Sequence, residues 1–489
     1  MPFILGTNSI KDTGYDVANS LRFNDGSSDY LSRTPSGAGS TTKGTFSFWV
    51  KRGVITSDMY LWTNFANSTN WSAIGINNVD QVYFYAESSG SAVANLKTNR
   101  VFRDPSAWYH IVVALDSTDG TADDRVKIYI NGVQETSFVQ RTNPSSSADL
   151  GISEAVPMEI GRYGGGSAYF DGYMAEVVMI DNTTLAASDF GEFDSDSPTI
   201  WKPKDVSGLT FGTNGFYLDF EDSSALGNDA AGSNNFTVNN LTAIDQTTDT
   251  CTNNFCTLMS NHPSASNFTL SEGNLVASKS GAATVGLFGS SIMLTKGKWY
   301  YESKITDLAA GERSRMGVAA YESVTGTSTL GASYSGFEFT GQTDGRFSLN
   351  VAGSQTEIDG FNTYAQDDII MWGIDMDNSK LYIGKNGDWF NYSSANTGGD
   401  PTSGNGWVTN NTTILAAPLT VGYVGHGSGT SDSTEVKINF GNAPYAISSG
   451  NSDSEGFGNF EYAVPSGYFA ICTKNLSLIH IWRCRRNLP

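Results

Sequence analysis

The chain has 489 residues, enough for two or three domains that each bury a core of their own. Only 16% of the residues are charged and 12% are aromatic, and Gly, Ser, Thr and Asn are abundant, which is typical of short β-strands joined by many turns. The net charge of −21 argues against nucleic acids and anionic membranes as electrostatic partners, because each phosphate contact needs a Lys or Arg.

Residues 1–20 predict an N-terminal arm or edge strand. The segment MPFILGTNSIKDTG has a four-residue apolar run without a basic region before it, so it lacks the pattern of a secretory signal. No stretch approaches the roughly 18 consecutive apolar residues that a membrane helix needs. We therefore expect no membrane insertion, and release by lysis or a dedicated system if the protein acts outside a bacterium.

Residues 21–196 predict a β-sandwich. Thr45–Val50 and Val126–Ile130 alternate apolar and polar residues, and Trp108–Val113 is a more continuous apolar strand. Asn131-Gly132 supplies a tight turn after the second of these strands. Seven or more strands at this spacing favour two packed antiparallel sheets.

The order FSFWVK, WYHIVVALD, VKIYINGV, MEIGRY and FDGYMAEVVMIDNTTLAASDF resembles laminin-G-like domains, which have the concanavalin A-like lectin/glucanase fold. The resemblance implies that the run from Gly172 to Leu185 forms the last strand and leads into a helical turn. It also implies a jelly-roll pair of antiparallel sheets. Some laminin-G-like domains bind calcium through loop carboxylates and carbonyls.

Four aspartates crowd one loop of this domain: Asp116, Asp119, Asp123 and Asp124. Calcium takes six to eight oxygen ligands, so this loop is the candidate metal site. Their spacing is not that of an EF-hand, and a solvated hairpin tip is the alternative. Apart from this candidate calcium site, we expect no cofactor.

Some glycosidases have the concanavalin A-like fold. They use a pair of carboxylates as acid and nucleophile, so such a pair in this sequence would indicate an enzyme. Laminarinase-type glucanases carry E-x-D-x-x-E or E-x-D-x-E on one strand, with the two Glu flanking the scissile bond. Glu192-Phe193-Asp194-Ser195-Asp196 lacks the second Glu, and Asp219-Phe220-Glu221-Asp222 fails likewise. We interpret both as solvated turns. Gly161–Gly166 (GRYGGG) lacks the Lys of a phosphate loop and predicts a hairpin tip. We expect no enzymatic activity.

Residues 197–262 predict a connector with one strand around Phe216–Phe220 that returns to the first sandwich. Cys251 and Cys256 are spaced so that a small disulfide loop is permitted but not required. The histidines are scattered and no C-x-x-C pair exists, which argues against a zinc site.

The stretch Asp367–Trp389 (DDIIMWGIDMDNSKLYIGKNGDW) predicts an antiparallel hairpin. Ile370, Trp372 and Ile374 alternate with residues of the other face, and Leu381–Ile383 forms the return strand. Asp377-Asn378-Ser379 and Asn386-Gly387 supply the turns.

This hairpin resembles the central hairpin of SPRY domains. The flanks agree: Gly297–Glu302 (GKWYYE), Met316–Ala319 (MGVA), Asn439–Gly441 (NFG) and Pro465–Ala470 (PSGYFA) are similar to other SPRY strands. The resemblance spans residues 263–475 and implies a second antiparallel sandwich. The predicted fold class is therefore all-β, with two concanavalin A-like jelly-roll sandwiches in tandem.

Residues 476–489 predict a non-native tail. Leu478–Pro489 (LIHIWRCRRNLP) carries three arginines and no acid in an otherwise acidic chain, and SLIHIWRCRR resembles translated sequencing-adapter read-through. We exclude this segment from the fold.

Aromatic residues in predicted loops are the candidate ligand-binding residues, because sugars stack on exposed rings. They are Trp62, Trp71, Tyr163 and Tyr169 in the first domain and Tyr334, Phe337, Trp389 and Trp407 in the second.

The tandem order of the two domains resembles virion proteins of marine bacteriophages. This resemblance implies a tail-fibre-associated or surface adhesin that binds host glycans or proteins through the loops at the sandwich rims, alongside other virion proteins. The alternatives are a structural protein that decorates the capsid or tail, and a glycan hydrolase or lyase. Two carboxylates facing each other across a concave sheet would favour the enzyme, whereas an extended apolar sheet face would favour the structural protein.

Overall fold

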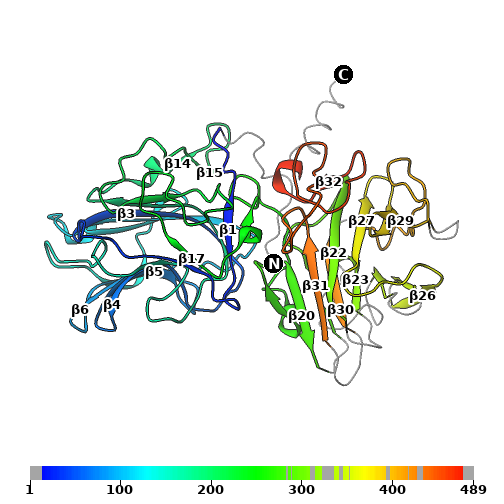
Figure 1. Ribbon diagram of the computed structural model, residues 1–489, viewed down its shortest axis with the longest axis horizontal. Helices are drawn as coiled ribbons and strands as arrows, with labels where there is room; N and C mark the ends of the chain where they lie inside the picture. The colour runs from blue at the N-terminus through cyan, green and yellow to red at the C-terminus, as the bar shows by residue number, and fades with distance from the viewer. Residues whose placement is uncertain are drawn as a thin grey trace. The chain divides into compact units, whose positions relative to one another are not determined.

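The computed structural model describes residues 14–281, 285–287, 289–308, 314–321, 335–340, 345–351, 353–391, 397–416, 418–426 and 433–476 (Figure 1). Most of the predicted arm, Tyr334 and the predicted tail beyond Leu476 lie outside the described residues. Within them, no helix is long and apolar enough to cross a membrane.

The chain forms two compact units that meet in the sequence between Asn253 and Asn254. Each is an antiparallel β-sandwich, which confirms the predicted fold class. The predicted boundaries at 196 and 262 differ from this division, because most of the predicted connector belongs to the first sandwich.

The first sandwich consists of short and medium strands with three 3₁₀ turns. Its strands are β1 (Ser20–Phe23), β2 (Tyr30–Arg33), β3 (Lys43–Arg52), β4 (Met59–Asn67), β5 (Asn70–Ile76), β6 (Val82–Ser88), β7 (Ser91–Thr98), β8 (Trp108–Asp116), β9 (Val126–Ile130), β10 (Val133–Gln134), β11 (Phe138–Thr142), β12 (Met158–Ile160), β13 (Gly172–Asp181), β14 (Gly191–Phe193), β15 (Trp201–Pro203), β16 (Phe216–Leu218), β17 (Thr237–Asn239) and β18 (Gln246–Thr247). The 3₁₀ turns are η1 (Ala122–Asp124), η2 (Ala187–Asp189) and η3 (Ala243–Asp245).

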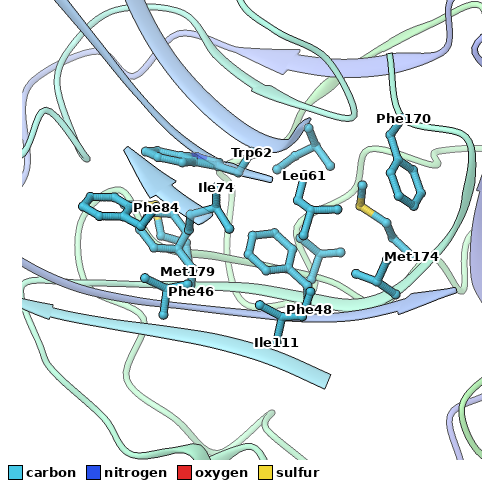
Figure 2. Packing of buried hydrophobic residues seen from close by; sticks show 14 of the residues in the cluster. Phe46, Phe48, Leu61, Trp62, Ile74, Phe84, Ile111, Phe170, Met174 and Met179 are labelled. Atoms are coloured by element: carbon cyan, nitrogen blue, oxygen red, sulfur yellow. The ribbon is translucent and has the colours of Figure 1, made fainter. Parts of the chain in front are cut away.

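Two eight-stranded sheets face each other in this unit. One, the β3 sheet, has the order β10-β9-β8-β3-β13-β1-β18, with β16 also paired to β13. The other, the β5 sheet, has the order β11-β7-β6-β5-β4-β12-β2-β17. Large apolar side chains fill the space between them. Figure 2 shows Phe46 and Phe48 of β3 packed among side chains that include Trp62, Ile74 and Phe84.

The predicted connector contributes four strands instead of one. The predicted strand is present as β16, which pairs with β13 as expected. In addition, β15 pairs with β14, β17 with β2 and β18 with β1. Because these strands have only two or three residues, their apolar pattern is too short to be recognised without their distant partners.

Loops from residue 182 onward cover the outer side of the β3 sheet. Trp201 stacks on His110, and its indole N–H donates to His110 Nδ1 at 2.9 Å. The other ring nitrogen of His110 lies 2.8 Å from Ser47 Oγ, so the buried imidazole is neutral and burial lowers its pKa to about 3. In Figure 1, β14 and β15 lie on the β3 side, opposite β4, β5 and β6.

The second sandwich is built in the same manner. Its elements are η4 (Pro263–Asn267), β19 (Thr269–Ser271), β20 (Val276–Ser280), β21 (Val285–Leu287), β22 (Lys298–Leu308), β23 (Ser314–Ala320), β24 (Gly336–Phe339), β25 (Phe347–Val351), β26 (Ser354–Ile358), β27 (Ile369–Asp375), β28 (Lys380–Lys385), β29 (Asp388–Trp389), β30 (Leu419–His426), β31 (Ser433–Asn439) and β32 (Phe469–Ala470). One sheet has the order β19-β20-β31-β22-β27-β28-β29, with β32 beside β22, and the other β21-β30-β23-β24-β25-β26.

The predicted hairpin between Asp367 and Trp389 is confirmed. Strands β27 and β28 pair antiparallel with Trp372 opposite Ile383. Asn386 and Gly387 have φ of 50° and 95°, the left-handed geometry that a tight Asn-Gly turn requires. The first sandwich repeats this turn at Asn131 and Gly132, with φ of 48° and 78°.

Cys251, Cys256 and Cys472 are free thiols in this structure. Cys256 packs in the core of the second sandwich, and Cys251 packs against Val17 and Trp49 in the first.

Candidate functional site

Two of the predicted ligand-binding residues, Trp71 and Tyr163, lie against each other on the outward face of the β5 sheet. Their ring centroids are 5.2 Å apart in an edge-to-face arrangement, and both rings are half-buried. Neighbouring rings extend the pair into a continuous group. We call this group the aromatic platform; it consists of Tyr60, Phe65, Trp71, Tyr83, Tyr85 and Tyr163.

Strand alternation turns the rings of β5 and β6 outward. Phe84 of β6 lies in the core, so its neighbours Tyr83 and Tyr85 point to the opposite face. Ile74 of β5 is likewise in the core, which puts Trp71 on the outward face by parity. Trp71 and Tyr85 are neighbours there, with ring centroids 4.8 Å apart.

Tyr163 is the centre of the platform, and a glycine-rich turn places it there. Its ring lies 5.0 Å from that of Tyr60 and 5.3 Å from that of Phe65. Gly161 has φ of +86°, which favours glycine, and a Cβ at Gly164 would lie only 2.2 Å from the Cβ of Phe65. The segment predicted as a hairpin tip therefore folds back and lays a tyrosine on the sheet.

A second group of side chains continues this face towards β2. The guanidinium of Arg162 lies over the ring of Tyr30 at 3.7 Å and within 6.0 Å of Tyr169, another predicted ligand-binding residue. Glu159 on β12 forms an ion pair with Arg162. The cation is thus held by a carboxylate and an aromatic face together.

The platform tyrosines are neutral hydrogen-bond donors at physiological pH. Burial raises the pKa values of Tyr60, Tyr83 and Tyr163. Burial and a hydrogen bond to Glu87 raise the pKa of Tyr85 to about 12, and its hydroxyl donates to that carboxylate at 2.5 Å.

Polar side chains of β7 border the platform. Asn95 is paired with Tyr85 across the strands, and Lys97 with Tyr83. The side-chain oxygen of Asn95 is buried and has no hydrogen-bond partner among the described residues. An amide and an ammonium group therefore stand next to aromatic rings on an outward sheet face.

Four predicted ligand-binding residues lie on strands and not on loops, and two of these four are fully buried. Trp62 lies in β4, fully buried, with its ring 4.4 Å from that of Phe46 (Figure 2). Phe337 lies in β24 and is also fully buried. Neither ring presents a face to a ligand, so these two predictions are wrong. A β-bulge between Tyr60 and Trp62 explains the first, because it shifts the side-chain alternation by one residue.

Trp389 and Trp407 are half-buried residues of the second sandwich. Both pack against one buried cluster that contains Tyr300 and Phe460. The ring of Trp389 lies 6.2 Å from that of Tyr300. Tyr334 lies outside the described residues.

Each of the four loop aspartates forms an ion pair or a hydrogen bond with a nearby residue. Asp116 pairs with Lys43 at 2.9 Å, Asp123 with Arg141 at 3.4 Å and Asp124 with Lys127 at 3.1 Å. Asp119 accepts a hydrogen bond from the backbone of Thr121. In the described part of the chain, no three His, Cys, Asp or Glu side chains are grouped to hold a metal ion. Calcium binding by this loop stays a prediction.

The candidate carboxylate runs were predicted to be solvated turns, but Glu192 lies on strand β14 and Asp194 is buried in the turn that follows it. Asp194 accepts hydrogen bonds from the backbone amides of Asp196 and Ser197. Glu192 forms an ion pair with Lys202 on the neighbouring strand. Asp222 caps the backbone amide of Ser224.

Sequence reasoning missed Tyr60, Phe65, Tyr83, Tyr85 and Arg162. A signal exists in the run Val82-Tyr83-Phe84-Tyr85-Ala86-Glu87. Both faces of this strand are aromatic, so one face must carry its rings outward. The meeting of Tyr163 with Trp71 has no local signal, since it depends on the pairing of β12 with β4.

The model of the concanavalin A-like lectin/glucanases superfamily matches residues 25–188, which include Trp71 and Tyr163. No curated protein matches the sequence. Many solved structures are similar to this chain, and three of them follow. The SPRY domain of human HERC1 is 16% identical and covers 34% of this chain and 87% of its own, with a TM-score of 0.25. Domains LG4-5 of the mouse laminin alpha1 chain are 7% identical and cover 94% and 88%, with a TM-score of 0.29. Domain 4 of the arabinanase AbnA from Geobacillus stearothermophilus, solved with arabinotriose, is 20% identical and covers 32% and 68%, with a TM-score of 0.23.

Proposed function

We propose that this chain is a non-catalytic carbohydrate-binding protein whose binding surface is the aromatic platform. The observation that carries this proposal is the gathering of six aromatic side chains from three strands and a turn on one outward sheet face. Most proteins keep such rings in the core, so an aromatic group on a sheet face points to a ligand.

The chemistry of the platform suits sugars. The C–H faces of a pyranose stack on aromatic rings, and hydroxyls of the sugar require donors and acceptors beside those rings. Here the hydroxyls of the half-buried Tyr60, Tyr85 and Tyr163 and the Glu87 carboxylate supply these groups. The match to a lectin and glucanase superfamily over residues 25–188 also supports the proposal. We thus propose the sheet face as the binding surface, whereas the sequence predicted the rim loops.

The test is glycan binding by the purified full chain and by two variants, Trp71→Ala and Tyr163→Ala. We expect each variant to lose about tenfold or more in affinity, because each removes a stacking surface. Phe193→Ala is the matched control, since Phe193 is an exposed ring of the same sandwich outside the platform. Circular dichroism and the melting temperature identify any variant that fails to fold.

If no glycan on a broad array binds the wild-type chain, or if both folded variants bind as tightly as wild type, the proposal is wrong. Release of reducing sugar from a bound glycan would instead support the hydrolase alternative.

The biological role that we propose for this binding is attachment of a bacteriophage virion to host glycans. Its support is the resemblance of the tandem domain order to marine bacteriophage virion proteins. Mass spectrometry of purified virions and inhibition of adsorption by the free protein test it. Detection in virions without inhibition of adsorption would favour a structural decoration protein.

A further inference from the structure

The aromatic groups of the β5 sheet form a line across the strands. Tyr85 lies on β6, Trp71 on β5, Phe65 on β4, and Tyr30 on β2, with β12 between the last two. Four inter-strand steps of about 4.8 Å separate β6 from β2, so the line spans about 19 Å. A single monosaccharide is much shorter than this line, whereas an extended oligosaccharide matches it.

The strand register keeps the line continuous. Trp71 pairs with Phe65 of β4, and Tyr85 of β6 lies two residue pairs further along the strands, on the same face. Beyond β4, the turn after β12 supplies Tyr163, which contacts both Trp71 and Phe65. The residue before Tyr163 in this turn, Arg162, lies over the ring of Tyr30. A ligand crossing the strands thus meets ring after ring without leaving the face.

The charges beside the line carry no positive excess. Glu159 neutralises Arg162 in a direct ion pair. Glu87 stands opposite Trp71 on one side, and Lys97 stands opposite Tyr83 on the other. Asp58 lies close enough to Tyr60 and Tyr83 to raise the pKa values of both hydroxyls. With three acids and two bases, this surface has no positive charge in excess with which to attract an acidic sugar, and the chain as a whole is strongly acidic.

From this arrangement, and resting on the proposed function, we infer that the ligand is a neutral, linear oligosaccharide that lies across the strands from Tyr85 to Tyr169. Trp71 and Tyr163 hold its central units. Tyr30 and Tyr169 hold the units towards β2, where Arg162 keeps the ring of Tyr30 in place. Affinity then depends on chain length, because each added unit reaches another ring.

The test is isothermal titration of the full chain with neutral gluco-, xylo-, manno- and arabino-oligosaccharides of increasing length. Acidic oligosaccharides from alginate and pectin are titrated in parallel. We expect affinity for a neutral series to rise about tenfold or more from the dimer to the hexamer. Acidic oligosaccharides of the same length should bind more weakly.

The variant Tyr169→Ala sharpens the test, because it removes the ring at the far end of the line. The affinity of this variant for the hexamer should fall about fivefold or more, whereas its affinity for the dimer should fall less than about twofold. Phe193→Ala should follow wild type at every length. Affinity that does not change with length, or acidic chains that bind more tightly, would overturn this inference while leaving carbohydrate binding in place. Loss of all glycan binding in the wild-type chain would overturn both.

Discussion

An Asp80→Asn variant is expected to be about 3 kcal/mol less stable than wild type, because it leaves the buried cation of Arg52 without its counter-charge. Asp80 is fully buried and accepts hydrogen bonds from Arg52 at 2.9 Å, from Arg103 at 2.7 Å and from the Thr56 amide at 2.7 Å. Arg52 is 1% exposed, and its guanidinium also donates to the carbonyl oxygen of Phe102.

Asparagine is the suitable replacement for Asp80. The backbone there has φ of +68°, which Asn tolerates as well as Asp does. The substitution therefore removes the charge with little change in shape or backbone strain. A loss of about 3 kcal/mol lowers the melting temperature of a domain of this size by about 6–12 °C. Calorimetry of the full chain measures this shift in the transition of the first sandwich.

Two further variants separate charge from packing at this position. Asp123→Asn removes an exposed partner of Arg141 and should change stability by less than about 1 kcal/mol. Adding Arg52→Met to Asp80→Asn removes the unpaired cation and should recover part of the loss. An Asp80→Asn protein as stable as wild type would show that the buried pair contributes nothing to folding.

The stabilisation by Asp80 depends on pH and is lost in acid. Burial raises the pKa of Asp80, but hydrogen bonds from Arg103, Thr56 and Arg52 outweigh it, so the pKa in the folded protein lies below the ordinary value. The stabilisation is therefore present above the unfolded pKa of about 3.9 and is lost as the pH falls through the folded value. Wild type and Asp80→Asn should converge in stability in strong acid.

The central hairpin and the two Asn-Gly turns could be predicted because their signals are local. Trp372 and its neighbours alternate over seven residues, long enough to specify a strand, although both faces of β27 are buried in the structure. Asn386-Gly387 requires a left-handed backbone whatever surrounds it. In the predicted connector, β16 could be predicted from its own apolar pattern. Strands β17 and β18 could not, since they depend on partners more than 200 residues earlier in the chain.

The candidate site was predictable only in part, for a related reason. Trp71 and Tyr163 stand out by residue type, but their contact is set by the pairing of β12 with β4 and by the glycine turn. Trp62 is also a tryptophan, but its ring is fully buried. A one-residue bulge in β4 turns the ring of Trp62 into the core, and no pattern in the local sequence indicates this bulge.

A Glu176→Gln variant is expected to lose the pH dependence that this buried carboxyl gives to wild type. Glu176 is 5% exposed and lies at a bulge of β13 with φ of +49°. The hydroxyl of Tyr217 donates to it at 2.9 Å and that of Tyr15 at 3.3 Å. Burial raises the pKa of Glu176 to about 8, although these two hydrogen bonds act against the rise.

The raised pKa of Glu176 determines whether stability rises or falls with pH. The folded protein binds the Glu176 proton more tightly than the unfolded chain, whose glutamate has a pKa of about 4.3. Wild type therefore loses stability from about pH 4 up to the folded pKa of about 8, and the loss is complete above it. Glutamine stays neutral throughout and keeps the size and the backbone geometry of glutamate.

The stability of Glu176→Gln relative to wild type should therefore rise by roughly 4 kcal/mol between pH 4 and pH 9. Urea denaturation across this range measures it, and the comparison of slopes is independent of any constant offset from altered hydrogen bonds. Glu455→Gln, which replaces an exposed carboxyl that does not contribute to the pKa of Glu176, is the matched control and should run parallel to wild type. Parallel curves for Glu176→Gln as well would mean that Glu176 titrates normally, and that water or a rearrangement of Tyr15 and Tyr217 relieves its burial.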